Sequence, residues 1–360
     1  MTSPSPRLRD VLADVPSYVP GRRPAVLEGV TPYKLASNEN PYPPLPSVLE
    51  VVARASQEAN RYPDLLSTEL TAAVAAHDGV PAEHVVAGPG SVGVLSQVLT
   101  ATAGDGDEVV HAWRSFEAYP IVVRLSGARS VAVPLRPDGR HDLPAMAAAV
   151  TGRTRLVLVC SPNNPTGPVV TAEEVDAFLS AVPDDVVVVL DEAYREFVRP
   201  EAGAPDAVAL HLAHPNLVVL RTFSKAYGLA GLRVGYGLAH PAVADALRKT
   251  AIPFGVSTVA QAAAVASLEA EDELLERVRA IVDERERVVA ALVGQGWDLP
   301  ATEANFVWMP VGERATELAE ACGAVGLSVR AFPGDGVRVT VAEPEADDRF
   351  LEVAARFLRS

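Results

Sequence analysis

The sequence predicts an α/β protein in which a mostly parallel β-sheet is covered by helices on both faces, beside a smaller α+β domain. Three observations lead to this prediction. The chain has 360 residues, which fits one large domain plus a smaller one. Short, nearly continuous apolar runs alternate with helical patterns, as in sheets that are buried on both faces. A long charged helical segment then separates the last strands and helices from the rest of the chain.

The N-terminal region is expected to be an extended arm. Residues 1–45 are dense in proline, which disfavours regular packed helices. Two amphipathic helices are predicted next, from Pro46 to Asn60 and from Ser67 to His77. Ser67 is the predicted N-cap of the second helix, because serine side chains accept hydrogen bonds from free N–H groups at helix starts.

A glycine-rich turn joins the next strand to a helix. The strand Val85–Ala87 runs into Gly88-Pro-Gly-Ser91, and a helical pattern continues through Thr102. Free backbone N–H groups and the helix dipole at such a start favour an anion. Taken alone, however, this turn is better explained as an ordinary strand-to-helix connection, which needs glycine for the same steric reason.

Between Glu108 and Leu238, predicted strands alternate with predicted helices. The helix Thr171–Ala181 opens with a capping box, Thr171-Ala-Glu-Glu174. Ligands of parallel sheets bind at loops beyond the carboxyl ends of the strands, so chemical groups are sought there. The predicted strands are Glu108–Ala112, Ser130–Pro134, Arg155–Cys160, Val186–Leu190, Leu217–Arg221 and Val234–Leu238. The other predicted helices are Ala118–Leu125 and Leu143–Val150.

A smaller domain is predicted toward the C-terminus. The segment Asp272–Val293 predicts a long charged amphipathic helix that bridges two domains, and Gly294 ends it. We therefore divide the chain into an arm with part of the small domain (1–45), a large domain (46–272) and a small C-terminal domain (273–360). The other predicted helices are Pro241–Thr250, Ser257–Ala270, Ala315–Cys322 and Pro344–Leu358. The predicted strands are Ala304–Met309, Leu327–Arg330 and Val337–Val341.

Composition excludes several classes of partner. A net charge of −15 provides no basic surplus for nucleic acid or for an anionic membrane surface. The cysteines Cys160 and Cys322 form neither a metal-ligand spacing nor a disulfide framework, so we expect no metal and a reducing cytoplasm. Residues 1–24 lack the apolar core of a signal peptide. No uninterrupted apolar run reaches the roughly 18 residues of a membrane-spanning helix. We expect a cytoplasmic protein with small-molecule ligands.

The most informative stretch is Leu220–Gly235, which combines a lysine, hydroxyl groups, glycines and an arginine. A lysine becomes a nucleophile only when part of its population is neutral, which requires burial or nearby positive charge. Lys225 is that candidate, and Thr222, Ser224 and Arg233 have the groups that hold a phosphate. Together they indicate a phosphorylated aldehyde cofactor, pyridoxal phosphate. Taken alone, the stretch fits a surface loop with a solvated lysine equally well.

Two further segments supply groups that this cofactor requires. Asp191 directly follows five apolar strand residues and is the candidate carboxylate beside the pyridine nitrogen, although a turn cap is a common alternative. Asn164, in the loop Ser161-Pro-Asn-Asn-Pro-Thr-Gly167, can donate its amide NH2 to the cofactor's phenolic oxygen, and Tyr194 is a second donor. An Asn-Pro pair is frequent in simple turns, but seven such residues in a row are more specific.

The cofactor also requires an aromatic side chain that stacks on its ring and a cradle, that is, a group of residues that binds its phosphate. Phe116, in the segment Trp113–Tyr119, is the candidate for stacking on the ring, although a core position is the more frequent explanation of one aromatic residue. Each candidate residue is weak evidence by itself. Because the candidates all follow predicted strands of one sheet, together they favour a pyridoxal phosphate site. The predicted cradle consists of the backbone at Gly90 and Ser91 and the side chains of Thr222, Ser224 and Arg233.

Five motifs point to one family. They are Lys34-Leu-Ala-Ser-Asn-Glu-Asn-Pro41, Arg61-Tyr-Pro-Asp64, Ser161-Pro-Asn-Asn-Pro-Thr-Gly167, Asp191-Glu-Ala-Tyr194, and Ser224-Lys225 followed by Arg233. With these motifs the chain resembles fold-type I aminotransferases of the histidinol-phosphate aminotransferase subfamily over nearly its whole length. The resemblance implies pyridoxal 5'-phosphate as cofactor, catalysis by Lys225, Asp191 and Tyr194, and a homodimer with active sites at its interface.

The resemblance also assigns residues outside the large domain's strand ends. It implies that Tyr62 reaches the cofactor phosphate of the other subunit. It implies that Arg338, in the segment 337–340, binds the substrate, with Arg330 as a second cation nearby and Asn164 beside them. Tyr18 on the N-terminal arm would close over the substrate.

Within this subfamily, the aromatic amino acid aminotransferase branch is the better match. Histidinol-phosphate enzymes usually follow the glycine turn with Ser-Asp-Glu, whereas this chain has Ser91-Val92-Gly93. The segments Trp113–Tyr119 and Arg330–Arg338 resemble the aromatic branch. The resemblance then implies amino transfer between phenylalanine, tyrosine or tryptophan and 2-oxoglutarate, with Arg338 on the α-carboxylate. The alternative uses the same arginines for the phosphate of histidinol phosphate. A decarboxylase or lyase with this cofactor would differ at Arg330 and Arg338.

Overall fold

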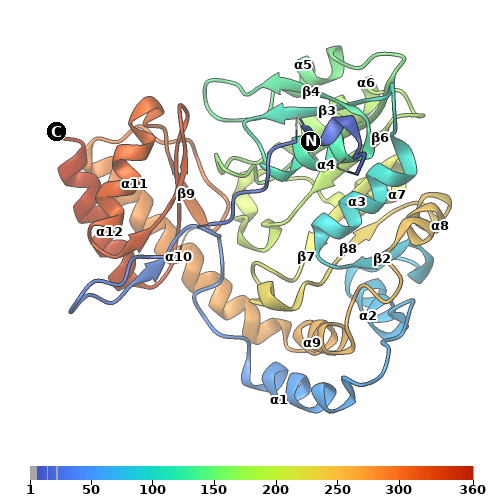
Figure 1. Ribbon diagram of the computed structural model, residues 1–360, viewed down its shortest axis with the longest axis horizontal. Helices are drawn as coiled ribbons and strands as arrows, with labels where there is room; N and C mark the ends of the chain where they lie inside the picture. The colour runs from blue at the N-terminus through green and yellow to red at the C-terminus, as the bar shows by residue number, and fades with distance from the viewer. Residues whose placement is uncertain (1–5, 14, 22, 360) are drawn as a thin grey trace, which may run out of the picture.

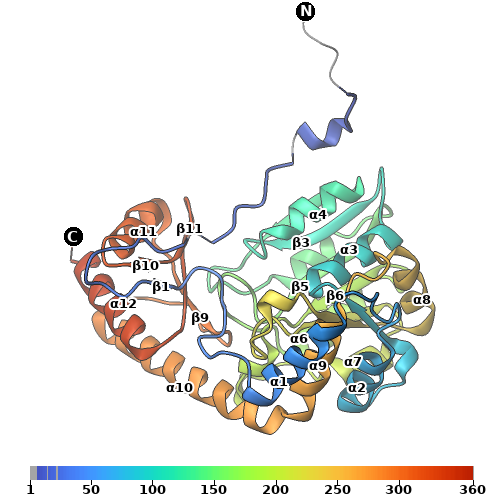
Figure 2. The ribbon, with the colours of Figure 1, turned by 60° about the horizontal axis from the view of Figure 1, so that its bottom comes forward.

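The computed structural model describes residues 6–13, 15–21 and 23–359. Two parts of unequal size lie side by side, and helix α10 (Glu271–Gln295) runs from one to the other (Figure 1). The N-terminal segment passes from beside helix α4 (Ala118–Ser126) to the small part before it enters the large part (Figure 2). No helix within the described ranges is both long and apolar enough to cross a membrane.

The large part is organised around a seven-stranded sheet with strand order β2-β8-β7-β6-β5-β3-β4. Strand β8 runs antiparallel to both of its neighbours, and the other pairs are parallel. This arrangement confirms the predicted mostly parallel α/β sheet. The strands are β2 (Val85–Gly88), β3 (Glu108–Trp113), β4 (Arg129–Pro134), β5 (Thr154–Cys160), β6 (Val187–Asp191), β7 (Leu217–Thr222) and β8 (Gly235–Leu238).

Helices cover both faces of this sheet because its strands are apolar on both sides. Along β5, Leu156 and Leu158 lie in one core and Val157 and Val159 lie in the other, as the two-residue period of a strand requires. Burial of each such side chain contributes about 1.5–3 kcal/mol. One face carries α3 (Ser91–Thr102), α4 and α8 (Pro241–Thr250). The opposite face carries α5 (Leu143–Ala148), α6 (Ala172–Ala181), α7 (Ala207–Ala213) and α9 (Thr258–Glu269).

The structure confirms the predicted capping box of one helix and corrects the predicted N-cap of another. The capping box of α6 is present, with Thr171 accepting from the backbone N–H of Glu174 and Glu174 accepting in return. Helix α2 (Thr68–Asp78) does begin after Ser67, but the Ser67 side chain makes no capping hydrogen bond. The carboxylate of Asp64 accepts from the N–H of Thr68 at 2.6 Å and so replaces it.

The small part holds a three-stranded antiparallel sheet with order β11-β12-β9. Its strands are β9 (Phe306–Met309), β11 (Arg330–Phe332) and β12 (Gly336–Thr340), and its helices are α11 (Ala315–Gly323) and α12 (Pro344–Phe357). The predicted strand Leu327–Arg330 is in fact two, because the chain changes sheet after β10 (Leu327–Ser328). Strand β10 pairs in parallel with β1 (Tyr33–Lys34), which attaches the N-terminal arm to the small part. Helix α1 (Pro46–Ala55) ends before the predicted Asn60, in a short 3₁₀ turn.

Helix α10 belongs to the cores of both parts. Its first half contributes Leu274, Val278 and Ile281 to the large core, and its second half contributes Val288 and Leu292 to the small one. These side chains recur at spacings of three, four and seven residues, so they form one stripe along the helix. The domain boundary proposed at residue 272 remains a prediction. Helix α10 begins at this boundary and packs against both parts of the molecule.

Candidate active site

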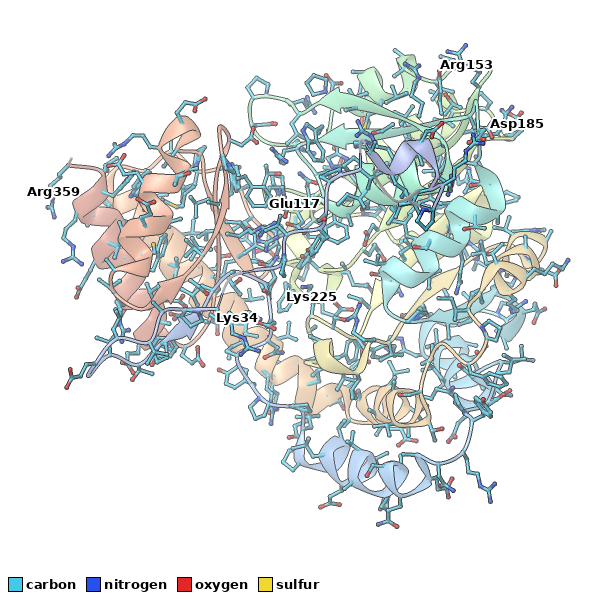
Figure 3. All side chains as sticks on the ribbon, viewed as in Figure 1. Lys34, Glu117, Arg153, Asp185, Lys225 and Arg359 are labelled. Atoms are coloured by element: carbon cyan, nitrogen blue, oxygen red, sulfur yellow. The ribbon has the colours of Figure 1, made fainter. Side chains whose placement is uncertain are left out.

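The predicted chemical residues come together at the carboxyl edge of the large sheet. Asp191 is the last residue of β6, Thr222 is the last residue of β7, and Asn164 follows β5 by four residues. Lys225 follows β7 by three residues, and Figure 3 shows it with Glu117 where the two parts of the molecule meet. This is the edge at which α/β sheets bind ligands.

Lys225 lies in a largely enclosed position rather than in open solvent. Its Nζ donates a hydrogen bond of 3.0 Å to the backbone carbonyl of Ser37, and its neighbours Phe223 and Ala226 are fully buried. Burial, followed by the positive charge of Arg338, lowers the pKa of Lys225 to about 7. A substantial fraction of this amine is therefore neutral near pH 7, as a nucleophile or base requires.

Asp191 is a buried carboxylate that makes hydrogen bonds with uncharged groups. Tyr119 donates its hydroxyl to Oδ2 at 2.8 Å, and the N–H of Ala193 donates to Oδ1 at 3.2 Å. Burial raises the pKa of Asp191 to about 6, while the Tyr119 hydrogen bond opposes that shift. Tyr119 had no assigned role in the sequence interpretation. Its place, one helical turn after Phe116, was the available signal, and the two rings meet edge to face at 5.5 Å.

The groups predicted to form a phosphate cradle lie together where helix α3 begins. Gly90 is the N-cap of α3 with φ of 79°, and a Cβ there would lie 2.6 Å from Nη2 of Arg233. Arg233 donates from Nη1 to Oγ of Ser224 at 3.1 Å. The backbone N–H of Ser224 in turn donates to Oγ1 of Thr222 at 3.1 Å. A guanidinium, two hydroxyl-bearing side chains and a helix N-terminus thus meet in one place, which suits a phosphate.

Ser91 is held close to strand β8, which begins two residues after Arg233. It is the first residue of α3, and a Cβ on Gly235 would lie 2.5 Å from the Ser91 backbone nitrogen. The glycine therefore allows the start of α3 to approach β8. This close approach explains why glycines recur on both sides of the cradle.

Asn164 and Tyr194 are oriented as hydrogen-bond donors. The Asn164 Oδ1 accepts from Nη1 of Arg338 at 2.5 Å, which leaves its NH2 group as the donor. The Tyr194 hydroxyl accepts from Nδ2 of Asn38 at 2.9 Å, so its own proton remains available. Burial raises the pKa of Tyr194, which keeps the phenol protonated.

The arginines Arg330 and Arg338 face each other across the β11–β12 pair. Arg338 is buried, donates from Nη2 to the carbonyl of Ala36 at 2.7 Å, and forms no ion pair within the described part of the chain. Arg330 instead forms an ion pair with Glu117, with closest contact of 2.8 Å.

The structure does not bring Tyr62 into contact with the other predicted site residues of its own chain, within the ranges described. Its side chain is 82% exposed, and its ring stacks on Phe254 at 4.7 Å. Tyr18 is 52% exposed and lies near enough to Arg338 to act on its pKa. The predicted roles of Tyr18 over the substrate and of Tyr62 at the other subunit's cofactor phosphate remain predictions.

Sequence reasoning missed the backbone groups and supports of the site. The carbonyls of Ala36 and Ser37 hold Arg338 and Lys225, and both belong to the quoted motif 34–41, which was the available signal. Asn163 also had no assigned role. Its side chain bonds to Ser115 at 2.7 Å, Thr166 at 2.7 Å and His141 at 3.0 Å, and so fixes the loop that carries Asn164.

These residues fit pyridoxal phosphate. A buried carboxylate that accepts only from uncharged donors suits a protonated ring nitrogen, the cradle at Gly90 and Arg233 suits a phosphate, and the partly neutral amine of Lys225 suits an aldehyde. Such groups serve reactions of amino groups, and the transaminases are one class of protein that uses them. The chain belongs to the family "Aminotransferase class I and II", whose family model matches residues 31–355. Membership confirms the predicted enzyme class, fold and cofactor.

Similar proteins share the full length of the chain. A protein of Streptomyces avermitilis named aromatic amino acid aminotransferase is 60% identical over 357 residues, which cover 99% of each chain. A protein of the same name from Streptomyces coelicolor is 58% identical over 357 residues, again covering 99% of each. Among solved structures, histidinol-phosphate aminotransferase from Sinorhizobium meliloti in complex with pyridoxal-5'-phosphate has a TM-score of 0.88 and 31% identity, covering 100% of this chain and 99% of that one.

Proposed function

We propose that this transaminase is an aromatic amino acid aminotransferase, which transfers an amino group between phenylalanine, tyrosine or tryptophan and 2-oxoglutarate. The observation that carries the proposal is the buried guanidinium of Arg338, which has no carboxylate partner among the described residues and lies within electrostatic range of Lys225. A buried cation of this kind suits a substrate carboxylate. The names of relatives at 47–60% identity support the same choice.

The proposed roles of the cofactor-binding residues follow from their contacts. When bound, pyridoxal phosphate supplies an aldehyde that condenses with amino groups and a ring that withdraws electrons from the substrate's Cα. The ionised carboxylate of Asp191 would hold a proton on the ring nitrogen. The Asn164 NH2 and the Tyr194 hydroxyl would donate to the phenolic oxygen. Phe116 would cover the ring.

The remaining groups hold the phosphate and move a proton. The phosphate would bind the N–H groups at Gly90 and Ser91 and the side chains of the cradle described above. The neutral amine of Lys225 would take the proton from the substrate's Cα and later return a proton to the reacting group, because its pKa near 7 suits both directions.

Aromatic rings accompany the arginine that would bind the carboxylate. The guanidinium carbon of Arg338 lies 5.5 Å from the ring centroid of Phe306 and 6.0 Å from that of Phe332. Tyr18 on the N-terminal arm lies near the same guanidinium. These rings support an apolar substrate side chain beside a carboxylate.

Histidinol-phosphate transamination is the second candidate function. The facing pair Arg330 and Arg338 favours it, because two guanidinium groups suit a phosphate. The name of the Sinorhizobium meliloti structure points the same way. The identity with that protein is 31%, about half the identity with the aromatic aminotransferases.

A substrate panel tests the choice. The holoenzyme is assayed with phenylalanine, tyrosine, tryptophan and histidinol phosphate, each with 2-oxoglutarate, and kcat/KM is compared. We expect the aromatic amino acids to exceed histidinol phosphate. A higher kcat/KM for histidinol phosphate would overturn the proposal in favour of the second candidate.

We also propose a homodimer whose subunits share their active sites. Exposed apolar side chains support this, since Leu65, Leu66, Ile252 and Phe254 line one groove and Tyr62 stacks on Phe254. Complementation tests it. After subunit exchange, a mixture of Lys225→Ala and Tyr62→Ala proteins should regain activity, because each heterodimer then contains one complete site. A mixture no more active than its parents would contradict shared sites.

A cytoplasmic location is the last part of the proposal. Cys160 and Cys322 are both free and buried, which suits a reducing compartment.

A further inference from the structure

Two like charges face each other at the substrate side of the site. In the antiparallel pair β11–β12, Arg330 stands directly opposite Arg338. Directly opposed residues of an antiparallel pair extend from the same face of the sheet, with Cβ atoms about 4.5–5.5 Å apart, and like charges there are destabilising. Each guanidinium therefore influences what the other can bind.

Glu117 neutralises one member of this pair. Its carboxylate accepts from Nε of Arg330 at 3.1 Å and from Nη2 at 2.8 and 2.9 Å, which makes a two-pronged ion pair. The remaining Nη1 of Arg330 donates to the carbonyl of Pro20 at 3.3 Å. The side chains of Arg330 and Glu117 are only 11% and 27% exposed, so solvent screens this ion pair weakly.

Arg338 has no such partner in the described part of the chain. Its Nη1 and Nη2 donate to uncharged oxygens, on Asn164 and Ala36, and its buried Nε has no hydrogen-bond partner. Burial lowers the pKa of Arg338, while Glu117 raises it and Arg330 lowers it, so both groups act on this guanidinium. The two arginines and Glu117 together carry a net charge of about +1, rather than +2.

We propose that Glu117 determines the substrate specificity of this transaminase, by setting the charge of the subsite so that it takes a carboxylate and disfavours a phosphate monoester. A carboxylate carries one negative charge, whereas a phosphate monoester carries about 1.5 to 2 at pH 7. The fixed charge of Glu117 repels the additional charge and occupies the donors of Arg330 that a phosphate would use.

The position of Glu117 keeps this charge in place. It is the residue before helix α4, where the helix dipole favours a negative charge, and it directly follows Phe116. Glu117 acts through Arg330, so it is a positioning residue rather than a catalytic one. The inference rests on the proposed aromatic amino acid activity.

The test compares the wild type with Glu117→Gln, which removes the charge and keeps the shape. We expect the ratio of kcat/KM for histidinol phosphate to that for phenylalanine to rise on the order of tenfold, mainly through the KM of histidinol phosphate. The matched control is Glu317→Gln, which removes a carboxylate bonded to Arg314 through two contacts on the surface of the small part. We expect that control to leave the ratio unchanged.

Equilibrium binding supplies a readout that does not depend on turnover. Calorimetry measures the affinity of the holoenzyme for 3-phenylpropionate and for 2-phenylethyl phosphate, which share an aromatic ring but differ in the anion. Glu117→Gln should raise the relative affinity for the phosphate on the order of tenfold. The double variant Glu117→Gln with Arg330→Gln has the wild-type net charge, so its preference should return toward the carboxylate.

Two results would overturn the proposal: an unchanged ratio, whether or not both activities fall equally, or the same shift in Glu317→Gln. Should Glu117→Gln fail to fold, Glu117→Ser decides, because it also removes the charge and must shift the ratio in the same direction. The proposed function is judged separately. A wild type that prefers histidinol phosphate refutes that function, whereas a wild type that prefers phenylalanine with an unshifted variant refutes the role of Glu117 alone.

Discussion

The hydroxyl of Tyr119 donates a hydrogen bond of 2.8 Å to the carboxylate of Asp191. Both side chains are buried, and burial raises the pKa of Asp191 to about 6. A donor to the ionised form favours that form, so the hydrogen bond opposes the effect of burial. Tyr119 therefore helps to set the pH above which Asp191 is ionised, and ionisation is what its proposed role beside the cofactor's ring nitrogen requires.

Tyr119→Phe is expected to shift the acid side of the pH profile. Without the donor, the pKa of Asp191 rises further, so the acid limb of kcat/KM should move to higher pH. A hydrogen bond to a charged group contributes about 1.5–3 kcal/mol, which corresponds to a shift of about one pH unit or more. Tyr236→Phe is the control, because its hydroxyl bonds to Asp78 away from the site. An acid limb at the same pH as in the wild type would contradict the role of Tyr119.

Cofactor capture by the apoprotein should report the lowered pKa of Lys225. The neutral amine attacks the aldehyde, so the capture rate should rise as pH increases through about 7. Arg338→Gln removes a nearby positive charge, so it should raise the pKa of Lys225 and move this rise to higher pH. Borohydride reduction followed by mass spectrometry measures the covalent product. Lys249→Ala, at an exposed lysine paired with Asp245, should behave as the wild type, and covalent product in Lys225→Ala would refute the assignment.

Gly90→Ala should weaken cofactor binding. The added Cβ would lie 2.6 Å from the Arg233 guanidinium, and φ of 79° is unfavourable for alanine. We expect the Kd for pyridoxal phosphate to increase on the order of tenfold, measured by titration of the apoprotein. Gly152→Ala is the matched control, since a Cβ there meets nothing within 4 Å. Equal affinity in both variants would argue against a phosphate cradle at Gly90.

Arg285→Leu should destabilise the whole fold. Arg285 is fully buried on α10, and it donates to the carbonyl of Phe197 at 2.9 Å and to Glu303 at 3.2 Å. Removal deprives the Phe197 carbonyl of this donor and breaks the ion pair with Glu303, which keeps only Arg199, so we expect a loss of about 3 kcal/mol in the free energy of unfolding. Denaturation followed by circular dichroism measures it. The half-exposed Arg287 gives the control Arg287→Leu, expected to cost about 1 kcal/mol or less. A loss of similar size in both variants would show that burial of Arg285 is not the cause.

Much of the fold could be predicted because its strands are apolar on both sides. The runs ending at Cys160, Asp191 and Thr222 mark a doubly covered sheet, and residues directly after them lie at its carboxyl edge. That rule is enough to bring Asn164 and Lys225 near Asp191. The short helix α7 was missed, and its seven residues are too few for a clear helical period.

The contacts that could not be predicted join groups far apart in sequence. Glu117 and Arg330 are 213 positions apart, and each alone has the composition of an ordinary surface residue. The backbone carbonyl of Ser37 accepts a hydrogen bond from Lys225. Every residue has such a carbonyl, so the amino-acid sequence does not show which carbonyl will contact the lysine. Such contacts depend on the relative position of the two parts, which no local pattern specifies.

The pairing of β1 with β10 sets an order of assembly for the molecule. The last strand of the large sheet ends at Leu238, whereas β10 begins at Leu327. During synthesis, the strands of the large sheet can therefore all be present before β10, the partner of β1, has been made. Residues 33–38 have left the ribosome by then but remain unpaired. The carbonyl of Ala36 can contact Arg338 only after residue 338 has been synthesised, which is later than β10 itself. A nascent chain is thus expected to acquire its substrate-binding side last, after most of its hydrophobic core has formed.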